Sequence, residues 1–182
     1  MYLAPEDRKR HGLVLPMSVA ENTSLPNVSS YSPLGWLNRK TEQQVAEQGV
    51  KRLRTKTPSI QQAVVNLSGG NQQKVVLAKW LAMSPKVLIL DEPTRGIDVG
   101  AKAEIYRHMA DLAAQGITIL MVSSDLEETI GMSDRVVVMH ERRLKGVLER
   151  HELTQLAIAN LMTGRDQVMG ARPGGEAEVA LS

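Results

Sequence analysis

The sequence predicts an α/β fold built around a mostly parallel sheet. Two short apolar segments, 86–91 and 117–122, have the length and composition of strands that are buried in such a sheet. Between them, residues 98–115 follow the apolar period of a helix, with Asp98 placed to cap it and Gly116 placed to end it. A strand, a helix and a strand in this order form a βαβ unit, so ligands are expected beyond the carboxyl ends of the strands.

Upstream of this unit, the chain alternates helical patterns with loops. Residues 1–17 hold short apolar pieces around a charged loop. A serine and a glutamate three residues apart form a capping box for a short helix over 18–24. Residues 25–38 are rich in Pro, Gly, Ser and Asn and are expected to be a loop, whereas 39–54 follow the pattern of a polar helix.

A buried helix is expected from Ser68 to about Met83, because its later turns are apolar nearly all round. Ser68 is expected to cap this helix with its side chain. Beyond the βαβ unit the patterns indicate a helix, two strands and an amphipathic helix, over 126–132, 135–139, 144–148 and 152–162.

These elements suggest one domain portion and a tail. Residues 1–164 are assigned to the domain, with a helical region over about 18–83 and the βαβ and C-terminal elements over 84–164. Residues 165–182 are rich in Gly and are expected to be a disordered tail.

Composition excludes several classes of function. The net charge of +2, from 22 basic and 20 acidic residues, is too small to indicate nucleic-acid binding, and the basic run Arg8–Arg10 is expected to be a solvated loop. Cysteine is absent, so disulfides and thiolate chemistry are excluded. No apolar run approaches the ~18 residues that span a bilayer, so a soluble cytoplasmic protein is expected.

Two adjacent carboxylates, Asp91 and Glu92, follow the first buried strand, and we call them the acidic pair. Mg²⁺ prefers few protein carboxylates together with phosphate oxygens and water, and a second carboxylate can activate an attacking water. The alternative is that the pair only terminates a strand before Pro93.

The segment Ser68–Gly70, which we call the glycine turn, precedes the buried helix. Free N–H groups at a helix N-terminus attract anions, and glycines allow the backbone to approach phosphate oxygens closely. The alternative is an ordinary serine-capped helix.

The motifs that surround these residues carry a family resemblance. The strings LSGGNQQK at 67–74, LILDEPTRGIDVGAK at 88–102 and VSSDLEE at 122–128 follow an early Pro-Glu-Asp-Arg. Over Tyr2 to Gly164 the chain resembles the C-terminal portion of an ABC transporter ATPase, the second half of the tandem ATPases of bacterial ribose, xylose, rhamnose, galactoside or autoinducer-2 importers. The resemblance implies a partial P-loop-NTPase-like domain with a helical signature-motif region.

The resemblance also implies residue roles, with ATP and Mg²⁺ as cofactors. Asp91 would be the metal carboxylate and Glu92 the catalytic base, and residues 96–98 would form the D-loop. The glycine turn would touch the γ-phosphate of ATP held by another ATPase half. The implied ATP-binding residues are Ser68, Gly69, Gly70, Gln72 and Asp98.

Three departures from the family pattern limit these roles. No G-x-x-x-x-G-K-[ST] phosphate loop occurs in the 182 residues. Glu6 stands where the family carries a Q-loop glutamine, and Ser124 stands where it carries the switch histidine. We therefore expect this chain alone to be inactive, with the donation of its signature motif to a partner ATP site as its main role.

The implied partners are an N-terminal ATPase half or a second ATPase subunit, membrane permease subunits and, indirectly, a periplasmic solute-binding protein. The permease would dock on the helical region over about 18–66, which places the chain at the cytoplasmic face of the inner membrane. Two other readings stay open: a non-catalytic remnant that only binds a partner, and the head of a DNA-repair or chromosome-maintenance ATPase. The latter ranks last because residues 1–60 show no heptad pattern.

Overall fold

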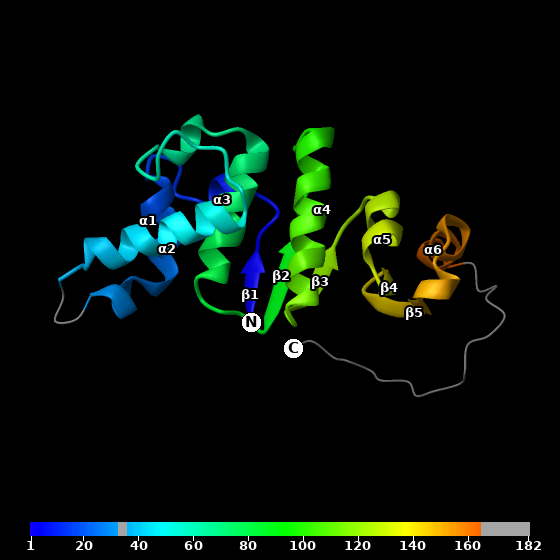
Figure 1. Ribbon diagram of the computed structural model, residues 1–182. Coiled ribbons are helices and arrows are strands. Elements are labelled where there is room, and N and C mark those ends of the chain that lie inside the picture. The colour runs from blue at the N-terminus through cyan, green and yellow to red at the C-terminus, as the bar shows by residue number, and fades with distance from the viewer. Residues whose placement is uncertain (33–35, 165–182) are drawn as a thin grey trace. The chain divides into compact units, whose positions relative to one another are not determined.

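The computed structural model describes residues 1–32 and 36–164, which fall into two compact units that divide between Ser124 and Asp125 (Figure 1). The expected tail, 165–182, lies outside the described residues. The elements of the first unit are β1 (Tyr2–Ala4), η1 (Arg8–Gly12), α1 (Val19–Ser24), η2 (Leu25–Tyr31), α2 (Arg39–Arg52), η4 (Val64–Asn66), α3 (Gly69–Leu81), β2 (Val87–Asp91), α4 (Val99–Ala114) and β3 (Thr118–Val122). Those of the second unit are α5 (Leu126–Met132), β4 (Arg135–His140), β5 (Arg143–Glu149), η5 (Arg150–Glu152) and α6 (Gln155–Met162).

The first unit contains a three-stranded parallel sheet in the order β1-β2-β3 (Figure 1). Ala4 pairs with Leu90, and Asp91 pairs with Val122, so the carboxyl ends of all three strands reach the same edge. The expected α/β class with a parallel sheet is confirmed. The sequence marked β1 only as a short apolar piece, because three residues are too few to show a period.

Helix α4 buries one side of its surface, through Ile105, Met109 and Leu112. In β2, Leu88 and Leu90 are fully buried. The expectation that residues 117–122 form a buried strand is right about the strand and wrong about burial, since Leu120 and Val122 are 52% and 51% exposed. Within its unit β3 is an edge strand that pairs with β2 alone, so it lacks a neighbour on its other side.

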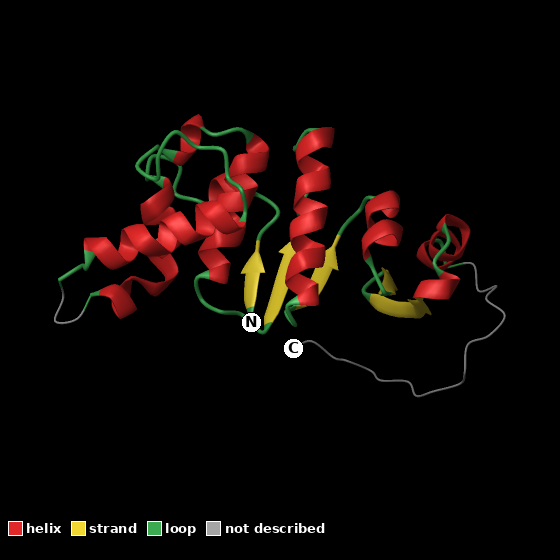
Figure 2. Ribbon diagram, viewed as in Figure 1, coloured by secondary structure: helices red, strands yellow, loops and turns green. Residues whose placement is uncertain are grey.

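The helices over 19–81 gather to one side of the sheet in the first unit (Figure 2). Helix α1 begins with the expected capping box: Ser18 N donates to Glu21 Oε2 at 2.7 Å, and Glu21 N donates to Ser18 Oγ at 3.2 Å. The expected loop over 25–38 is wrong in its first half, because Pro26, which fits the first turn of a helix, helps to start η2.

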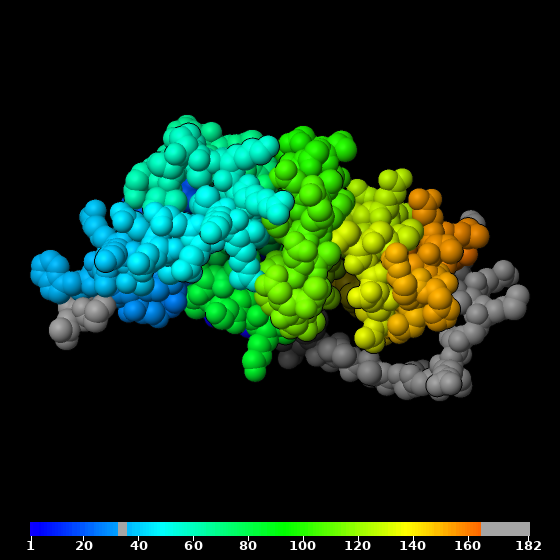
Figure 3. Space-filling view, viewed as in Figure 1, coloured from blue at the N-terminus to red at the C-terminus, as the bar shows by residue number. Residues whose placement is uncertain are grey.

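The C-terminal end of α2 lies beside α4 at the surface, as the cyan and green atoms in Figure 3 show. Arg52 donates a hydrogen bond there to the Gln115 side chain. This contact ties the helical region to the end of α4.

The second unit is a hairpin covered on one face by helices. Strands β4 and β5 pair antiparallel, and their buried side chains Val136, Val138 and Leu148 pack with Ile158 and Leu161 of α6. The helix expected over 152–162 starts at Gln155, because η5 occupies the preceding residues and Thr154 provides the cap. In neither unit do the described residues include a helix of the length and apolarity that a membrane crossing needs.

Candidate functional site

Two strand ends are joined at the carboxyl edge of the sheet by the acidic pair. Asp91, the last residue of β2, and Glu92 are both half-buried. Glu92 has a positive φ of 45°, which is uncommon for a residue other than glycine. Two hydrogen bonds of 2.8 Å hold it: Glu92 N donates to Val122 O, and Ser124 N donates to Glu92 Oε1. The structure thus brings Asp91, Glu92 and Ser124 together.

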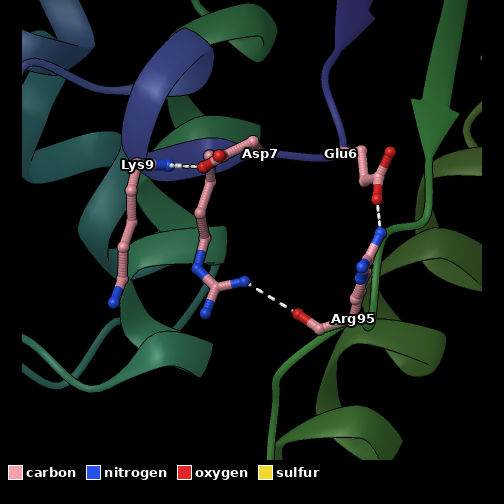
Figure 4. A pocket seen from close by; sticks show the side chains of 5 residues that line it. Glu6, Asp7, Lys9 and Arg95 are labelled. Atoms are coloured by element: carbon pink, nitrogen blue, oxygen red, sulfur yellow. Dashed lines mark hydrogen bonds and ion pairs between the residues drawn. The ribbon is translucent and has the colours of Figure 1, made fainter.

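A shallow pocket of about 250 Å³ lies beside this edge, lined only by charged residues: Glu6, Asp7, Arg8, Lys9 and Arg95. Figure 4 shows Glu6, from the loop after β1, pointing toward Arg95, from the turn after β2, and the two form an ion pair. Asp7 Oδ1 instead accepts hydrogen bonds from the N–H groups of Lys9 and Arg10, which caps η1. The Glu6 carboxylate is therefore paired with a cation of the same chain.

Arg8 fixes the turn that follows β2. Its guanidinium donates to the carbonyls of Arg95 at 2.8 Å and Gly96 at 3.2 Å. Burial lowers the pKa of Arg8, against the opposing effect of Asp7, but a guanidinium remains charged in proteins. The expectation that this basic run is only a solvated loop is wrong for Arg8. Sequence alone gave no signal for it, because its partners are carbonyls 87 and 88 residues away.

The glycine turn is packed against the same segment. A Cβ atom on Gly69 would lie 2.7 Å from Arg8 Nη2 and 3.1 Å from Gly96 O, and one on Gly70 would lie 2.6 Å from Ala101 Cβ. Side chains at these two positions would therefore push α3 away from the residues at the start of α4. Glycines are required here by close packing as well as by any ligand.

Asp98 stands next to this contact and caps α4 as expected. Its Oδ1 accepts a hydrogen bond of 2.9 Å from Ala101 N, and the residue is exposed.

Ser68 occupies the N-cap position of α3 but makes no side-chain cap hydrogen bond, so the expected serine cap is wrong. Its Oγ accepts a hydrogen bond of 2.9 Å from Asn71 Nδ2 instead. The first N–H groups of a helix have no acceptor within the helix, and among the described residues no side-chain cap supplies one at the start of α3. Within the turn Ser68 is exposed, Gly69 is half-buried and Gly70 is buried, so the Ser68 hydroxyl is the group that the turn presents to solvent.

Gln72 lies behind the turn and not on its exposed side. It is 4% exposed, and its Nε2 donates to the carbonyls of Val64 and Leu67, both at 3.2 Å. Its side chain thus holds the segment that leads into the glycine turn.

Lys74 is a supporting residue that sequence reasoning missed. Its side chain is 2% exposed, and Nζ contacts Glu104 Oε2 at 2.5 Å and Arg54 O at 3.1 Å. The hydrogen bond and the charge of Lys74 lower the pKa of Glu104. A lysine inside a nearly all-apolar helical run was the signal that could have revealed a buried ion pair.

His108, on α4, also belongs to these surroundings. Burial lowers its pKa, and the charge of Lys74 adds to the effect. The neutral imidazole is thus favoured at this position.

The described residues include no group of three or more His, Cys, Asp or Glu side chains that could hold a metal. A site with one or two carboxylates nevertheless suits Mg²⁺ bound together with phosphate oxygens. Among the described residues, no hydrogen bond or ion pair joins the glycine turn to the acidic pair.

Comparison with known proteins supports the family resemblance. The family described as "ABC transporter" matches residues 6–95. The ribose import ATP-binding protein RbsA of Bacillus licheniformis is 57% identical over 159 residues, which cover 87% of this chain and 32% of that protein. A putative ribose/galactose/methyl galactoside import ATP-binding protein of Pseudomonas syringae pv. tomato is 51% identical over 162 residues, which cover 89% of this chain and 31% of that protein. The chain thus spans about a third of the length of these relatives.

The fold resembles solved ATP-binding cassettes. The dimeric, post-hydrolysis structure of the cassette MJ0796 bound to ADP and Pi matches with a TM-score of 0.68 at 21% identity, over 81% of this chain and 62% of that one. The ADP conformation of the cassette MJ1267 matches with a TM-score of 0.65 at 24% identity, over 82% of this chain and 60% of that one. At these identities the likeness concerns the fold alone.

Proposed function

Because the chain belongs to the ABC transporter family, we propose that it is part of an ATPase that powers uptake of a sugar or sugar-like solute. Its main role is to donate the glycine turn to an ATP site held by a partner ATPase half or subunit. The observation that carries this proposal is the exposed Ser68 at a helix start whose N–H groups lack a side-chain cap. Such a start attracts phosphate oxygens through its donors and the helix dipole.

Each site residue has a role in this proposal. Ser68, Gly69 and Gly70 would contact the terminal phosphate of ATP, with Asp98 nearby and Gln72 holding the turn from behind. Bound ATP would supply the phosphoryl group, and the Asp91 carboxylate would help to hold the Mg²⁺ that accompanies it. Glu92 would polarise the attacking water, and Ser124 N–H already holds one of its carboxylate oxygens.

The chain's own ATP site is proposed to be the weaker one. No phosphate-loop motif is present in the 182 residues, and Glu6 and Ser124 replace the expected glutamine and histidine. This same observation favours a second candidate, in which the chain is a non-catalytic module that only binds a partner ATPase.

The proposed assembly includes membrane permease subunits that dock on the helical region over about 18–66, and through them a periplasmic solute-binding protein. This would hold the chain at the cytoplasmic face of the inner membrane. Nucleic acid is not among the proposed partners, because the net charge is only +2.

Sugar uptake by a full-length tandem ATPase that carries this chain tests the proposal. Ser68→Arg places a long cation where the phosphate would lie, so we expect it to abolish uptake. Glu92→Gln is expected to reduce uptake far less, since it affects only the chain's own site. The reverse ranking would contradict the proposal.

A further inference from the structure

Asn71 links the glycine turn to a neighbouring loop through both ends of its side-chain amide. Oδ1 accepts a hydrogen bond of 2.8 Å from Lys56 N, and Nδ2 donates one of 2.9 Å to Ser68 Oγ. Asn71 lies one helical turn after Ser68, so it reaches the serine without distorting α3.

The backbone partner determines which way this amide points. A backbone N–H can only donate, so the amide oxygen must face Lys56, and the NH₂ group must face Ser68. The Ser68 oxygen is therefore an acceptor in this contact, and its own hydrogen has to point elsewhere. Among the hydrogen bonds between described residues, the Ser68 hydroxyl donates to no acceptor, and the residue is exposed.

The loop that holds the amide is itself anchored from the buried side. Lys74 Nζ donates to Arg54 O at 3.1 Å, and Thr55 N donates to Val50 O at 2.9 Å. Both contacts restrain the backbone immediately before Lys56. Turning the Asn71 amide over would set its NH₂ group against the Lys56 N–H, so a single orientation is retained.

We propose that Asn71 is a positioning residue, which turns the Ser68 hydroxyl outward as a ready hydrogen-bond donor to a phosphate oxygen. This inference rests on the proposed function of the glycine turn. A donor that already points at the anion has no competing bond to break when the anion arrives, and a hydrogen bond to a charged group is a strong one.

Asn71→Asp is the variant that tests this role, because Asp has nearly the same shape and keeps the oxygen that accepts from Lys56 N. Its second oxygen cannot donate, so the Ser68 hydroxyl would donate to it and turn inward. We expect this change to weaken ATP-dependent association about tenfold or more, as Ser68→Ala should. The assay uses the whole chain, ATP, and as partner the part of the Bacillus licheniformis RbsA that lies outside the aligned 159 residues.

A double-mutant cycle separates the orientation of Ser68 from the added negative charge. In the Ser68→Ala background Asn71→Asp retains only its charge effect, which we expect to be about threefold or less for exposed groups. Asn38→Asp is the matched control, since in its bonds with other described residues the Asn38 side chain uses only its oxygen, which accepts from Thr41 N at 3.2 Å. We expect this control to bind as the unaltered chain does.

The side-chain amide resonance of Asn71 in the whole chain provides a second readout. It should shift in Ser68→Ala, because its acceptor is lost; an unchanged resonance would overturn the inference. An equal cost of Asn71→Asp with and without Ser68, or no cost at all, would also overturn it and leave the proposed function standing. If Ser68→Ala shifted the resonance but left association intact, the proposed function would fail, and the positioning role with it.

Discussion

The glycine turn is supported by buried side chains, whereas the half-buried acidic pair is held by backbone N–H and carbonyl groups. Behind the turn lie Gln72 and Lys74, both at most 4% exposed, and both donate hydrogen bonds to backbone carbonyls. The acidic pair is half-buried, and the Glu92 side chain is held by a backbone N–H of the loop after β3.

This difference indicates which part of the chain is ready to act. The turn has buried side-chain support and an exposed Ser68 hydroxyl, which is the arrangement expected of a preorganised phosphate contact. In the loop after β1, Glu6 is paired with Arg95 instead of remaining free to contact a ligand. We infer that the chain contributes more to a partner's ATP site than to one of its own.

The largest expected effect concerns the buried ion pair behind the turn. Glu104→Leu leaves the Lys74 ammonium buried without its carboxylate, so we expect a loss of about 3 kcal/mol in the free energy of unfolding. Lys74→Met removes the buried charge itself and should cost less, about 1–2 kcal/mol, mainly through the lost bond to Arg54 O. Urea unfolding of the whole chain, followed by circular dichroism, measures both values. Equal losses would show that the Lys74 charge is not desolvated as described.

A smaller effect is expected from a methyl group at the turn. Gly70→Ala would place Cβ 2.6 Å from Ala101 Cβ, and we expect a net loss of about 1–2 kcal/mol from overpacking. Gly100→Ala is the matched control, because its new Cβ would meet only Asp98 Oδ1, at an ordinary 3.4 Å. That control should be neutral or stabilising by up to about 1 kcal/mol. A destabilised control with a tolerated Gly70→Ala would mean that the turn and α4 are not packed this closely.

A smaller effect, a dependence of stability on pH, is expected from His108, whose pKa is lowered by burial and then by the charge of Lys74. Since the folded-state pKa lies below the unfolded value of about 6.5, the stabilisation is complete above that value and is lost as pH falls below it. The melting temperature should therefore drop between about pH 7.5 and pH 5, and His108→Gln should drop less. Glu104 does not interfere, because its lowered pKa places its effect below about pH 4.3. Parallel melting curves for the two proteins would contradict the expectation.

The smallest effect on stability is expected at the acidic pair. Glu92→Gln keeps an oxygen that can accept from Ser124 N, so the free energy of unfolding should change by less than about 0.5 kcal/mol. The same unfolding experiment measures it. A loss as large as that of Glu104→Leu would show that the acidic edge is as firmly built into the unit as the turn.

Sequence patterns predicted helix starts and ends well where these depend on residues that are close together in the sequence. The capping box at Ser18 and Glu21, the cap at Asp98 and the helix end near Gly116 all depend on residues a few positions apart. The exposure of β3 could not be predicted, because an apolar strand has the same sequence pattern whether or not other strands lie on both sides of it. The parallel arrangement of the two strands followed from the βαβ order, whereas the pairing of Asp91 with Val122 is seen only in the structure.

The motifs of the candidate site could be predicted from the sequence, but the side chains that hold these motifs in place could not. The glycine turn and the acidic pair have recognisable residue strings. In contrast, Arg8 bonds to carbonyls far along the chain, and Lys74 pairs with Glu104 across two helices, so neither contact leaves a local pattern. Ser68 appeared to be a cap because nothing in the sequence shows that Asn71 occupies its oxygen.

The most direct test is ATP hydrolysis by the whole chain, measured alone and with the part of the Bacillus licheniformis RbsA outside the aligned 159 residues. We expect no turnover by the chain alone. We also expect ATP-dependent association of the two parts, which Ser68→Arg abolishes and Glu92→Gln does not. Turnover by the chain alone that disappears in Glu92→Gln would contradict the proposed donor role, because the acidic pair would then form a complete site of its own.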